Sequence, residues 1–217
     1  TGASGERFGF SVAGGTTILD NGDGLGIISD FNGDNVDDLL VGAPNADVSG
    51  SAVGAAYMFY GPITSNTTSS AADAVFTGQF GQDSSNPSNH NAVNTGYAVA
   101  FVGDINDDGY ADITIGDPSK KNSGSTDGEA YLIFGRGDTF DSGGVQLTGQ
   151  YEGTTSLNET SWRAQLGREI NSDGGKREQM GSALDAIGDV NGDGIDDLAV
   201  GAYRWDASGG SNQNHGG

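Results

Sequence analysis

Three nine-residue segments of the chain carry aspartate and asparagine at the spacing of oxygen ligands for a hard cation. The segments begin at Asp30, Asp104 and Asp189, and each places Asp at positions 1, 5 and 9 and Asn at position 3. The backbone carbonyl of position 7 adds a fifth oxygen. Calcium suits this set because it takes about six to eight oxygen ligands with weak directional preference. The spacing therefore predicts three calcium-binding loops.

The residues after each loop argue against an EF-hand. An EF-hand needs an acidic residue at position 12, where this chain has Val41, Ile115 and Val200. Each loop runs instead into a short apolar segment, at residues 39–43, 113–117 and 198–202. Apolar runs with β-branched residues are typical of buried strands. The loops therefore lead into strands and not into helices.

The composition favours an all-β protein. Hydrophobic residues make up 34% of the 217 residues and glycine alone accounts for 39, so we expect few helices and many turns. The formal net charge is −21. Nine of the 30 acidic residues occupy positions 1, 5 and 9 of the three loops, and three bound calcium ions would bring the net charge to −15. Only nine residues are Lys or Arg. Binding to nucleic acids is not expected, because it requires clustered cations on the protein.

The chain contains no cysteine and no membrane-spanning pattern. Without cysteine there is no disulfide, thiolate metal site or thiol nucleophile. No apolar run approaches the roughly 18 to 20 residues of a membrane span, and no signal segment opens the chain. We therefore expect a soluble or already processed protein. Because weak calcium sites fill only where calcium is abundant, we expect an extracellular or cell-surface location, in a bacterium or an archaeon.

Internal similarity extends beyond the loops, which recur after 74 and then 85 residues. A strand rich in glycine and small residues precedes each loop, at residues 8–13, 95–100 and 180–185. In two units a third and a fourth strand pattern follow, at residues 54–61 and 74–80 and again at 128–135 and 144–151. Four strands at this spacing predict β-propeller blades, each a four-stranded antiparallel sheet.

The units resemble FG-GAP repeats, the blades of integrin α-subunit-type calcium-binding β-propellers. Phe8-Gly9 matches the Phe-Gly part of the repeat motif, and Gly42-Ala43-Pro44 matches the Gly-Ala-Pro part. The later units depart from it, with Thr95-Gly96 and Met180-Gly181 in place of the aromatic-Gly pair, and Asp117-Pro118 in place of Ala-Pro. The resemblance implies that each calcium loop joins the innermost strand to the second strand on one face of the disc, and that ligands bind to the opposite face.

The resemblance also assigns the ligands of three calcium ions, through side chains at positions 1, 3, 5 and 9 and the backbone carbonyl at position 7. The assigned residues are Asp30, Asn32, Asp34, Val36 and Asp38; Asp104, Asn106, Asp108, Tyr110 and Asp112; and Asp189, Asn191, Asp193, Ile195 and Asp197. Position 6 is Asn35, Gly109 or Gly194. We expect a positive φ angle there, because glycine and asparagine tolerate one.

We interpret residues 1–217 as a single β-propeller segment with blade units at about residues 3–78, 79–149 and 150–217. The third unit stops after its second strand, whereas closed propellers usually have about four to eight blades. We therefore expect an incomplete ring, with the remaining blades in the same longer chain or in another chain.

Long segments at residues 79–94 and 150–179 connect consecutive units, and the resemblance places them on the ligand-binding face. The second contains Trp162, Arg163 and Arg168, in a chain where such residues are scarce. Arg and Trp together can bind a carboxylate, a sulfate or a sugar ring, so these three are candidate ligand-binding residues. In the alternative interpretation, Trp162 packs the segment onto the disc and the arginines pair with acidic residues.

Arg136-Gly137-Asp138 is a cell-attachment tripeptide directly after a predicted strand. Gly and Asp are so frequent in this chain that the triplet is also expected from hairpin chemistry alone. We favour the structural interpretation.

The favoured function is a calcium-stabilised extracellular recognition or adhesion module that presents long loops to a protein or glycan ligand. The alternative is a structural propeller segment of a surface layer, a filament or a large secreted protein. A third option is the non-catalytic part of a secreted hydrolase, because FG-GAP-like repeats accompany a phospholipase-type catalytic domain. We expect no enzymatic activity in this segment, because it has only two histidines, His90 and His215, and no catalytic spacing.

Overall fold

The prediction of an all-β fold is confirmed. A computed structural model describes residues 5–15, 29–48, 51–78, 94–122, 125–126, 128–140, 146–157, 164–166 and 179–203. Strands account for all the regular structure in these ranges except one 3-10 turn, Ser69–Ala71. Among the same residues, no helix has the length and hydropathy needed to cross a bilayer.

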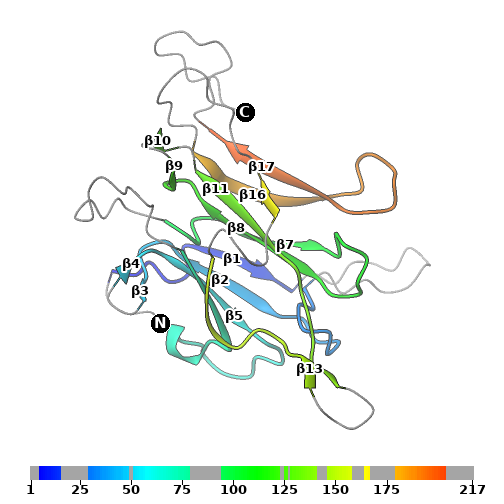
Figure 1. The fold of residues 1–217 in the computed structure, drawn as a ribbon. Coiled ribbons are helices and arrows are strands. Elements are labelled where there is room, and N and C mark those ends of the chain that lie inside the picture. Colours follow the sequence, from blue (N-terminus) through cyan, green and yellow to red (C-terminus); the bar gives the residue numbers. More distant parts are fainter. Residues whose placement is uncertain are drawn as a thin grey trace.

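The strands form three main sheets, which lie next to one another in chain order (Figure 1). The first sheet, in spatial order, consists of β1 (Ser11–Gly14), β2 (Leu39–Ala43), β5 (Ala55–Phe59), β6 (Ala74–Thr77) and β14 (Gly153–Ser156). The second consists of β7 (Val99–Gly103), β8 (Asp112–Asp117), β11 (Glu129–Ile133) and β15 (Ala164–Leu166). The third consists of β16 (Met180–Gly188) and β17 (Asp197–Ala202).

Three hairpins complete the described structure. They are β3 (Asp47–Val48) with β4 (Ser51–Ala52), β9 (Lys121–Asn122) with β10 (Ser125–Thr126), and β12 (Thr139–Phe140) with β13 (Gln146–Thr148). The first strands of the three sheets, β1, β7 and β16, lie in succession, with β7 in contact with the other two. This arrangement agrees with propeller blades placed side by side, and the described residues contain no closed ring.

The strand register repeats at the 74-residue spacing seen in the sequence. Ala43 pairs with Ala55 between β2 and β5, and Asp117 pairs with Glu129 between β8 and β11. Because the side chains of a strand alternate between its two faces, equal register means that equivalent positions of the two units face the same way. The second and third predicted strands of units one and two are therefore confirmed. The first strands are present but begin three and four residues later than predicted, at Ser11–Gly14 and Val99–Gly103.

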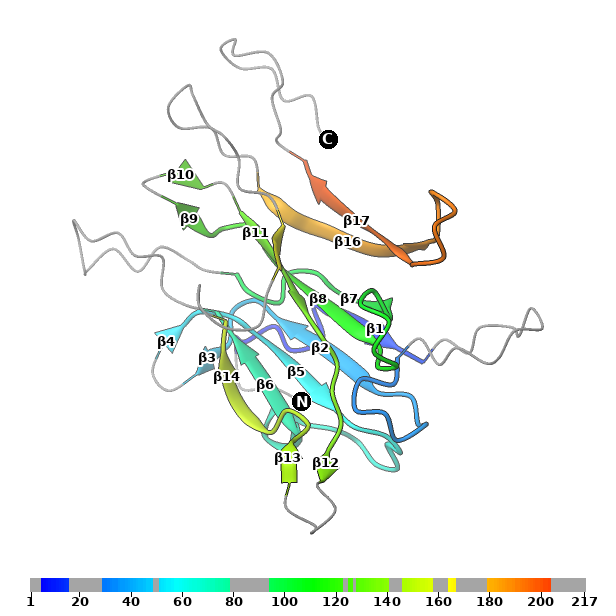
Figure 2. The same cartoon turned by 45° about the vertical axis from the view of Figure 1, so that its right-hand side comes forward.

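The predicted fourth strand of the second unit, residues 144–151, is wrong. Gln146–Thr148 pairs with β12 in a hairpin, and the fourth strand of the second sheet is β15, which pairs with β11. Between them β14 returns to the first sheet and adds a fifth strand, parallel to β6 (Figure 2). The strands therefore do not follow the predicted unit boundary at residues 149 and 150, because an apolar pattern does not specify which sheet edge a strand will join.

The main hydrophobic core lies between the first and second sheets. Phe31, Phe76 and Tyr151 form its aromatic centre, with the Tyr151 ring stacked on Phe31 at 5.4 Å between centroids and edge-on to Phe76 at 5.3 Å. A smaller core that includes Val102 and Leu132 lies between the second and third sheets. Tyr151 joins the first core from the segment that leads into β14, so this segment fastens the first sheet to the second.

Paired glycines allow neighbouring sheets to approach closely. Gly42 on β2 lies against the carbonyl of Gly96, and Gly116 on β8 lies against the carbonyl of Gly181, with no room for a Cβ atom at Gly42 or Gly116. Gly96 and Gly181 have φ angles of 83° and 80° and approach the carbonyls of Ala55 and Glu129. The glycines of the aromatic-Gly and Gly-Ala-Pro patterns therefore meet across each sheet boundary.

Replacing Gly96 with alanine should destabilise the protein more than replacing Gly9. Gly9 occupies the equivalent position of the first unit with a φ of 85°, and open space lies around its missing Cβ. Both changes carry the strain of a positive φ, about 1–2 kcal/mol, but only Gly96→Ala adds overpacking between sheets, typically about 1–3 kcal/mol. Urea denaturation measures the difference in the free energy of unfolding. Equal destabilisation by the two variants would contradict the predicted overpacking at Gly96.

The second sheet contains a buried charged cluster at the end where the β3–β4 and β9–β10 hairpins lie. Asp117, Lys120 and Glu129 are 0%, 6% and 1% exposed, and the equivalent residues of the first sheet are three alanines, Ala43, Ala46 and Ala55. Nζ of Lys120 lies 3.9 Å from Oε2 of Glu129, which also accepts a 2.6 Å hydrogen bond from the Tyr131 hydroxyl.

Asp117 holds the start of the second unit in place. Its carboxylate accepts hydrogen bonds from the Asn94 and Ser119 N–H groups and from Oγ1 of Thr95. Burial raises the pKa of Asp117 to about 6 despite these hydrogen bonds and the nearby Lys120. The folded state therefore favours the protonated carboxyl group.

Asp117 should make the protein less stable as the pH rises from about 4 to 7. Between the unfolded pKa near 3.8 and the folded pKa near 6, the folded state binds more protons than the unfolded state, so the free energy of unfolding falls with increasing pH. The contribution is on the order of 3 kcal/mol. Urea denaturation at pH 4 and pH 7, with calcium held constant, should show this slope reduced in Asp117→Asn. An unchanged slope would refute the assignment.

Candidate calcium loops

The three predicted calcium loops connect equivalent strands at one end of the sheets. Each loop precedes the second strand of its sheet, β2, β8 or β17, and follows the first strand, as the family resemblance implied. The hairpins β3–β4 and β9–β10 lie at the opposite end, and both views show this separation (Figures 1 and 2). The sheets therefore bring all three loops to one face of the molecule.

The position-1 aspartate organises each loop through backbone hydrogen bonds. In the first loop, the carboxylate of Asp30 accepts N–H groups from Gly33 at 2.7 Å, Asp34 at 3.0 Å and Asn35 at 2.8 Å. The corresponding donors are Asp108 and Gly109 for Asp104, and Gly192, Asp193 and Gly194 for Asp189. The loop backbone thus wraps around one carboxylate in all three copies.

Positions 3 and 5 repeat the same hydrogen bonds in each loop. In the first loop, Oδ1 of Asn32 accepts the N–H of Asp34 at 3.2 Å, and Oδ1 of Asp34 accepts the N–H of Val36 at 2.9 Å. The equivalent acceptors are Asn106 and Asp108 in the second loop, and Asn191 and Asp193 in the third. These bonds turn the asparagine and aspartate oxygens inward over the loop.

The position-9 aspartate connects each of the first two loops to two strands. Asp38, the residue before β2, accepts the Phe31 N–H at 2.8 Å and the N–H of Gly61, beyond β5, at 2.9 Å. Asp112 does the same with Ile105 and with Gly135, beyond β11. The third loop keeps the first bond, from Val190 to Asp197 at 3.0 Å, but Oδ1 of Asp197 accepts the Asn191 amide instead.

Two positions of each loop have a positive φ angle. Position 6 was predicted, and Asn35, Gly109 and Gly194 have φ angles of 66°, 89° and 92°. Position 4 was not predicted, and Gly33, Asp107 and Gly192 have φ angles of 78°, 58° and 80°. Asp107 was missed because only the glycines at that position in the other loops signal the conformation.

The position-9 carboxylates of the first two loops are buried near other acidic residues. Burial, together with the charges of Asp30 and Asp34, raises the pKa of Asp38 to about 6 against the two backbone hydrogen bonds. Burial and the charges of Asp108 and Asp104 raise the pKa of Asp112 to about 6 in the same way. In the exposed third loop, backbone N–H groups, chiefly that of Gly194, lower the pKa of Asp189.

The acidic side chains alone do not form a closed metal cage. Within the described ranges, no three His, Cys, Asp or Glu side chains are placed to hold a metal ion together. The aspartates at positions 1, 5 and 9 of each loop are therefore not placed as a three-carboxylate site in this structure, and the predicted ligand set also includes an asparagine oxygen and a backbone carbonyl. The raised pKa values of Asp38 and Asp112 show that each lies in the field of two further carboxylates. This donor set fits a hard cation bound by oxygen.

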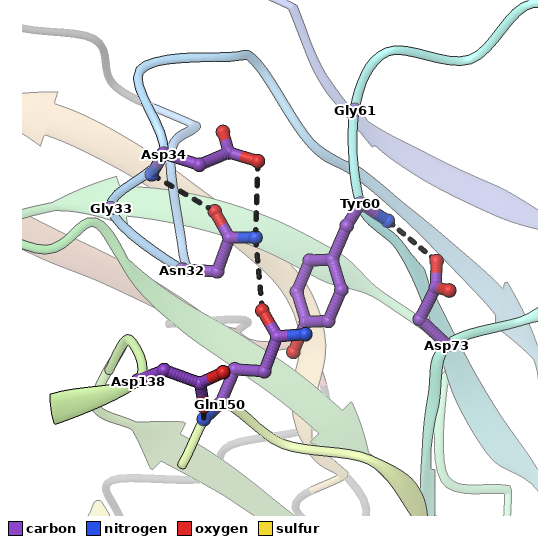
Figure 3. Close-up of a pocket in the computed structure, with 8 residues that line it drawn as sticks. All are labelled: Asn32, Gly33, Asp34, Tyr60, Gly61, Asp73, Asp138 and Gln150. Carbon is purple, nitrogen blue, oxygen red and sulfur yellow. Dashed lines mark hydrogen bonds between the residues drawn. The ribbon is translucent and has the colours of Figure 1, made fainter. Parts of the chain in front are cut away.

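A polar pocket of about 530 Å³ borders the first loop. Asn32 and Asp34 line it together with Tyr60 and Asp73 from the first sheet and Asp138 and Gln150 from the segments around the β12–β13 hairpin (Figure 3). Nδ2 of Asn32 donates to Oδ2 of Asp34 at 3.3 Å and to Oε1 of Gln150 at 3.1 Å. Two predicted ligands thus lie beside an open polar space through which an ion could enter.

The Arg136-Gly137-Asp138 tripeptide is part of the packing between the sheets. The Arg136 guanidinium lies over the Tyr151 ring at 4.0 Å, and Gly137 is buried against the carbonyl of Asn32. Oδ1 of Asp138 accepts the Gln150 N–H at 3.0 Å. These contacts support the structural interpretation. The candidate ligand-binding residues Trp162, Arg163 and Arg168 and both histidines lie outside the described residues.

Comparison with known proteins supports the resemblance seen in the sequence. Residues 180–216 match the FG-GAP repeat. The chain is also similar to integrin alpha-4 of Xenopus laevis, with 27% identity over 180 residues. The similar region covers 83% of this chain and 14% of that relative, so the chain spans a small part of its length. The chain is therefore similar to FG-GAP repeats and to an integrin α chain, in agreement with its blade-like sheets.

Proposed function

We propose that this chain is a calcium-stabilised extracellular recognition or adhesion module. The observation that carries the proposal is the hydrogen-bond pattern that recurs in all three loops around the side-chain oxygens of positions 1, 3 and 5, within the predicted ligand set of positions 1, 3, 5, 7 and 9. Each loop would hold one calcium ion through these five residues. The similarity to an integrin α chain and the FG-GAP match support an adhesion-type role at the cell exterior.

The bound ion would neutralise carboxylates that the fold keeps close together. Asp38 and Asp112 are 2% and 0% exposed, and each joins its loop to the ends of the second and third strands of its sheet. A cation bound by such a residue would favour the ionised form and so strengthen the link between strands. In this proposal calcium supports architecture and takes no part in a reaction.

A protein or glycan ligand would bind at the end opposite the calcium loops. The segment between β6 and β7 leaves and re-enters the described structure at Gly78 and Asn94, both of which lie at the hairpin end. Gly78 donates its N–H to the Gly54 carbonyl, and Asn94 donates to Asp117. The sheets would thus present the segment at residues 79–93 away from the ions. Trp162, Arg163 and Arg168 in the other long segment stay candidate ligand-binding residues.

A second candidate function is a structural propeller segment of a larger assembly. The position-2 residue Phe31 is fully buried between the first and second sheets, whereas the equivalent residue of the third loop, Val190, is 67% exposed. Ile187 on β16 is also exposed. A further blade, in a longer chain or in another chain, would bury these residues as the second sheet buries Phe31.

We propose no catalytic role for this segment, including when it forms part of a secreted hydrolase. The extracellular or cell-surface location agrees with the similarity to an integrin α chain. The expected bacterial or archaeal origin receives no support, because the similar protein comes from an animal, Xenopus laevis.

Removing calcium should lower the melting temperature. An ion at 100 times its Kd contributes about 2.7 kcal/mol per site, which corresponds to roughly 5–10 °C for a chain of this size. Asp104→Asn keeps the side-chain shape but removes a charged ligand. In the presence of calcium, it should therefore reproduce part of the decrease in melting temperature. Differential scanning calorimetry with calcium and with excess chelator measures both effects.

The matched control is Asp107→Asn. Asp107 lies in the same loop, is exposed, is not a predicted ligand and has a φ of 58°, which asparagine tolerates. It should leave the calcium-dependent shift intact. Melting that is the same with and without chelator would reject the proposed calcium stabilisation.

Trp162→Ala combined with Arg163→Ala should reduce ligand binding at least tenfold without lowering the melting temperature. The reason is the loss of the aromatic face and the guanidinium that could hold a sugar or a carboxylate. The calcium-loaded chain is first screened on a glycan array, and Kd values are then measured for any glycan that binds. Arg204→Ala combined with Trp205→Ala, the other adjacent Arg and Trp pair, is the control. Unchanged affinity in the first double variant would favour the packing interpretation.

A further inference from the structure

We propose that the first and second calcium loops bind their ions cooperatively, and that the third loop binds independently of them. This inference rests on the proposed binding of calcium. The coupling follows from direct contacts between the first loop and the second unit, and it predicts that each ion raises the affinity of the other site.

Backbone hydrogen bonds join the first loop to the second unit. The carbonyl of Asp30, the position-1 residue, accepts the N–H of Ala111 in the second loop at 2.9 Å. The carbonyl of Phe31 accepts the N–H of Arg136 at 2.9 Å, and Arg136 follows the end of β11. The backbone of the first loop is therefore held by residues whose own positions depend on the second loop.

The side chain of Tyr110 contacts the first loop at Gly33. The carbonyl of Tyr110 is the predicted position-7 ligand of the second ion, and its ring lies against Gly33, leaving no room for a Cβ atom there. Gly33 in turn donates its N–H to Asp30 at 2.7 Å. Fixing the Tyr110 backbone on the second ion would therefore fix the ring that supports the turn around the first ion.

A third contact positions a predicted ligand of the first ion from the second unit. Gln150 follows β13 and accepts a hydrogen bond from Nδ2 of Asn32 (Figure 3). The same amide nitrogen also donates to Oδ2 of Asp34, and the Asn32 oxygen accepts the Asp34 N–H, so Gln150 helps to fix the orientation of this predicted ligand. Gln150 is itself held by Asp138, which accepts its backbone N–H.

The third loop lacks these contacts in the described part of the chain. The missing Cβ atoms of Gly109 and Gly192 have open space around them, and Ile195, the counterpart of Tyr110, is 40% exposed. The third loop approaches the second sheet through Asp196, whose carboxylate lies at Gly103. Asp196 occupies the same position 8 as Ala111, but among the described residues no backbone hydrogen bond joins the third loop to the second as the Ala111 N–H joins the second loop to Asp30.

The physical basis of the coupling is shared ordering. An ion in the second loop would restrict Tyr110 and Ala111, so a later ion in the first loop would have less backbone to order and would bind more tightly. Thermodynamic linkage requires the effect to be reciprocal, with the same factor in both directions. Coupling of this kind typically changes affinity by about 5- to 150-fold.

Calcium titrations followed by NMR can measure each site separately. The amide groups of Gly33 and Gly192 donate to Asp30 and Asp189, and that of Gly109 donates to Asp104, so each reports on its own loop. Asp108→Ala removes an exposed position-5 ligand of the second loop, and Asp193→Ala removes the equivalent ligand of the third. We expect Asp108→Ala to weaken calcium binding at Gly33 at least fivefold, and Asp193→Ala to leave it unchanged.

Two further variants separate coupling from damage to the loops. Asp34→Ala in the first loop should weaken binding at Gly109 by the same factor that Asp108→Ala weakens binding at Gly33. Tyr110→Ala keeps every ligand atom of the second loop, so all three sites should still fill, but the coupling factor should fall toward one.

The outcomes distinguish the inference from the function on which it rests. If calcium shifts none of the three amide signals, the proposed calcium binding is wrong, and the inference fails with it. If all three sites bind calcium but Asp108→Ala and Asp193→Ala affect Gly33 equally, calcium binding stands and the coupling is wrong. A coupling factor in Tyr110→Ala equal to that of the unchanged chain would overturn the proposed route of coupling.

Discussion

The first two sheets depend on the hydrogen bonds of one buried residue, the aspartate at position 9 of each calcium loop. Asp38 and Asp112 each link the start of their loop to the end of the third strand through two backbone hydrogen bonds. Burying a carboxylate is unfavourable unless hydrogen bonds or a cation compensate for its charge. The same residue therefore fixes the strand geometry and creates the demand for positive charge that a calcium ion would meet.

Close packing of the sheets side by side places equivalent loops of each sheet at the same end of the molecule. Paired glycines such as Gly42 and Gly96 allow adjacent sheets to approach, and Tyr151 fills the core between them. The loops consequently gather at one end, where Tyr110 and Ala111 contact the first loop. The β3–β4 and β9–β10 hairpins and the ends of the segment at residues 79–93 lie at the other. Ion binding and ligand binding would thus occupy opposite faces, which supports a structural role for the ions in the proposed module.

The sequence was sufficient to predict features that depend on local pattern. The loops, the strands on either side of them and the positive φ at Asn35 all follow from residue types at fixed spacing. The edge strands β14 and β15 do not, because a short strand such as Gly153–Ser156 has no signal for which sheet it joins. Asp117 looked like a minor departure from the Ala-Pro pattern, and only the register shows that it belongs with Lys120 and Glu129.

The chain compensates for buried acid in two different ways, and the contrast supports a cation in the loops. At the hairpin end, Asp117 is buried with Lys120 nearby, and the lysine lowers its pKa against the effect of burial. At the loop end, the charges that act on Asp38 are those of two other aspartates, and both raise its pKa. If the fold required only a neutral carboxyl group there, nearby acids would serve no purpose. Their repetition in three loops is better explained if the compensating charge comes from solution.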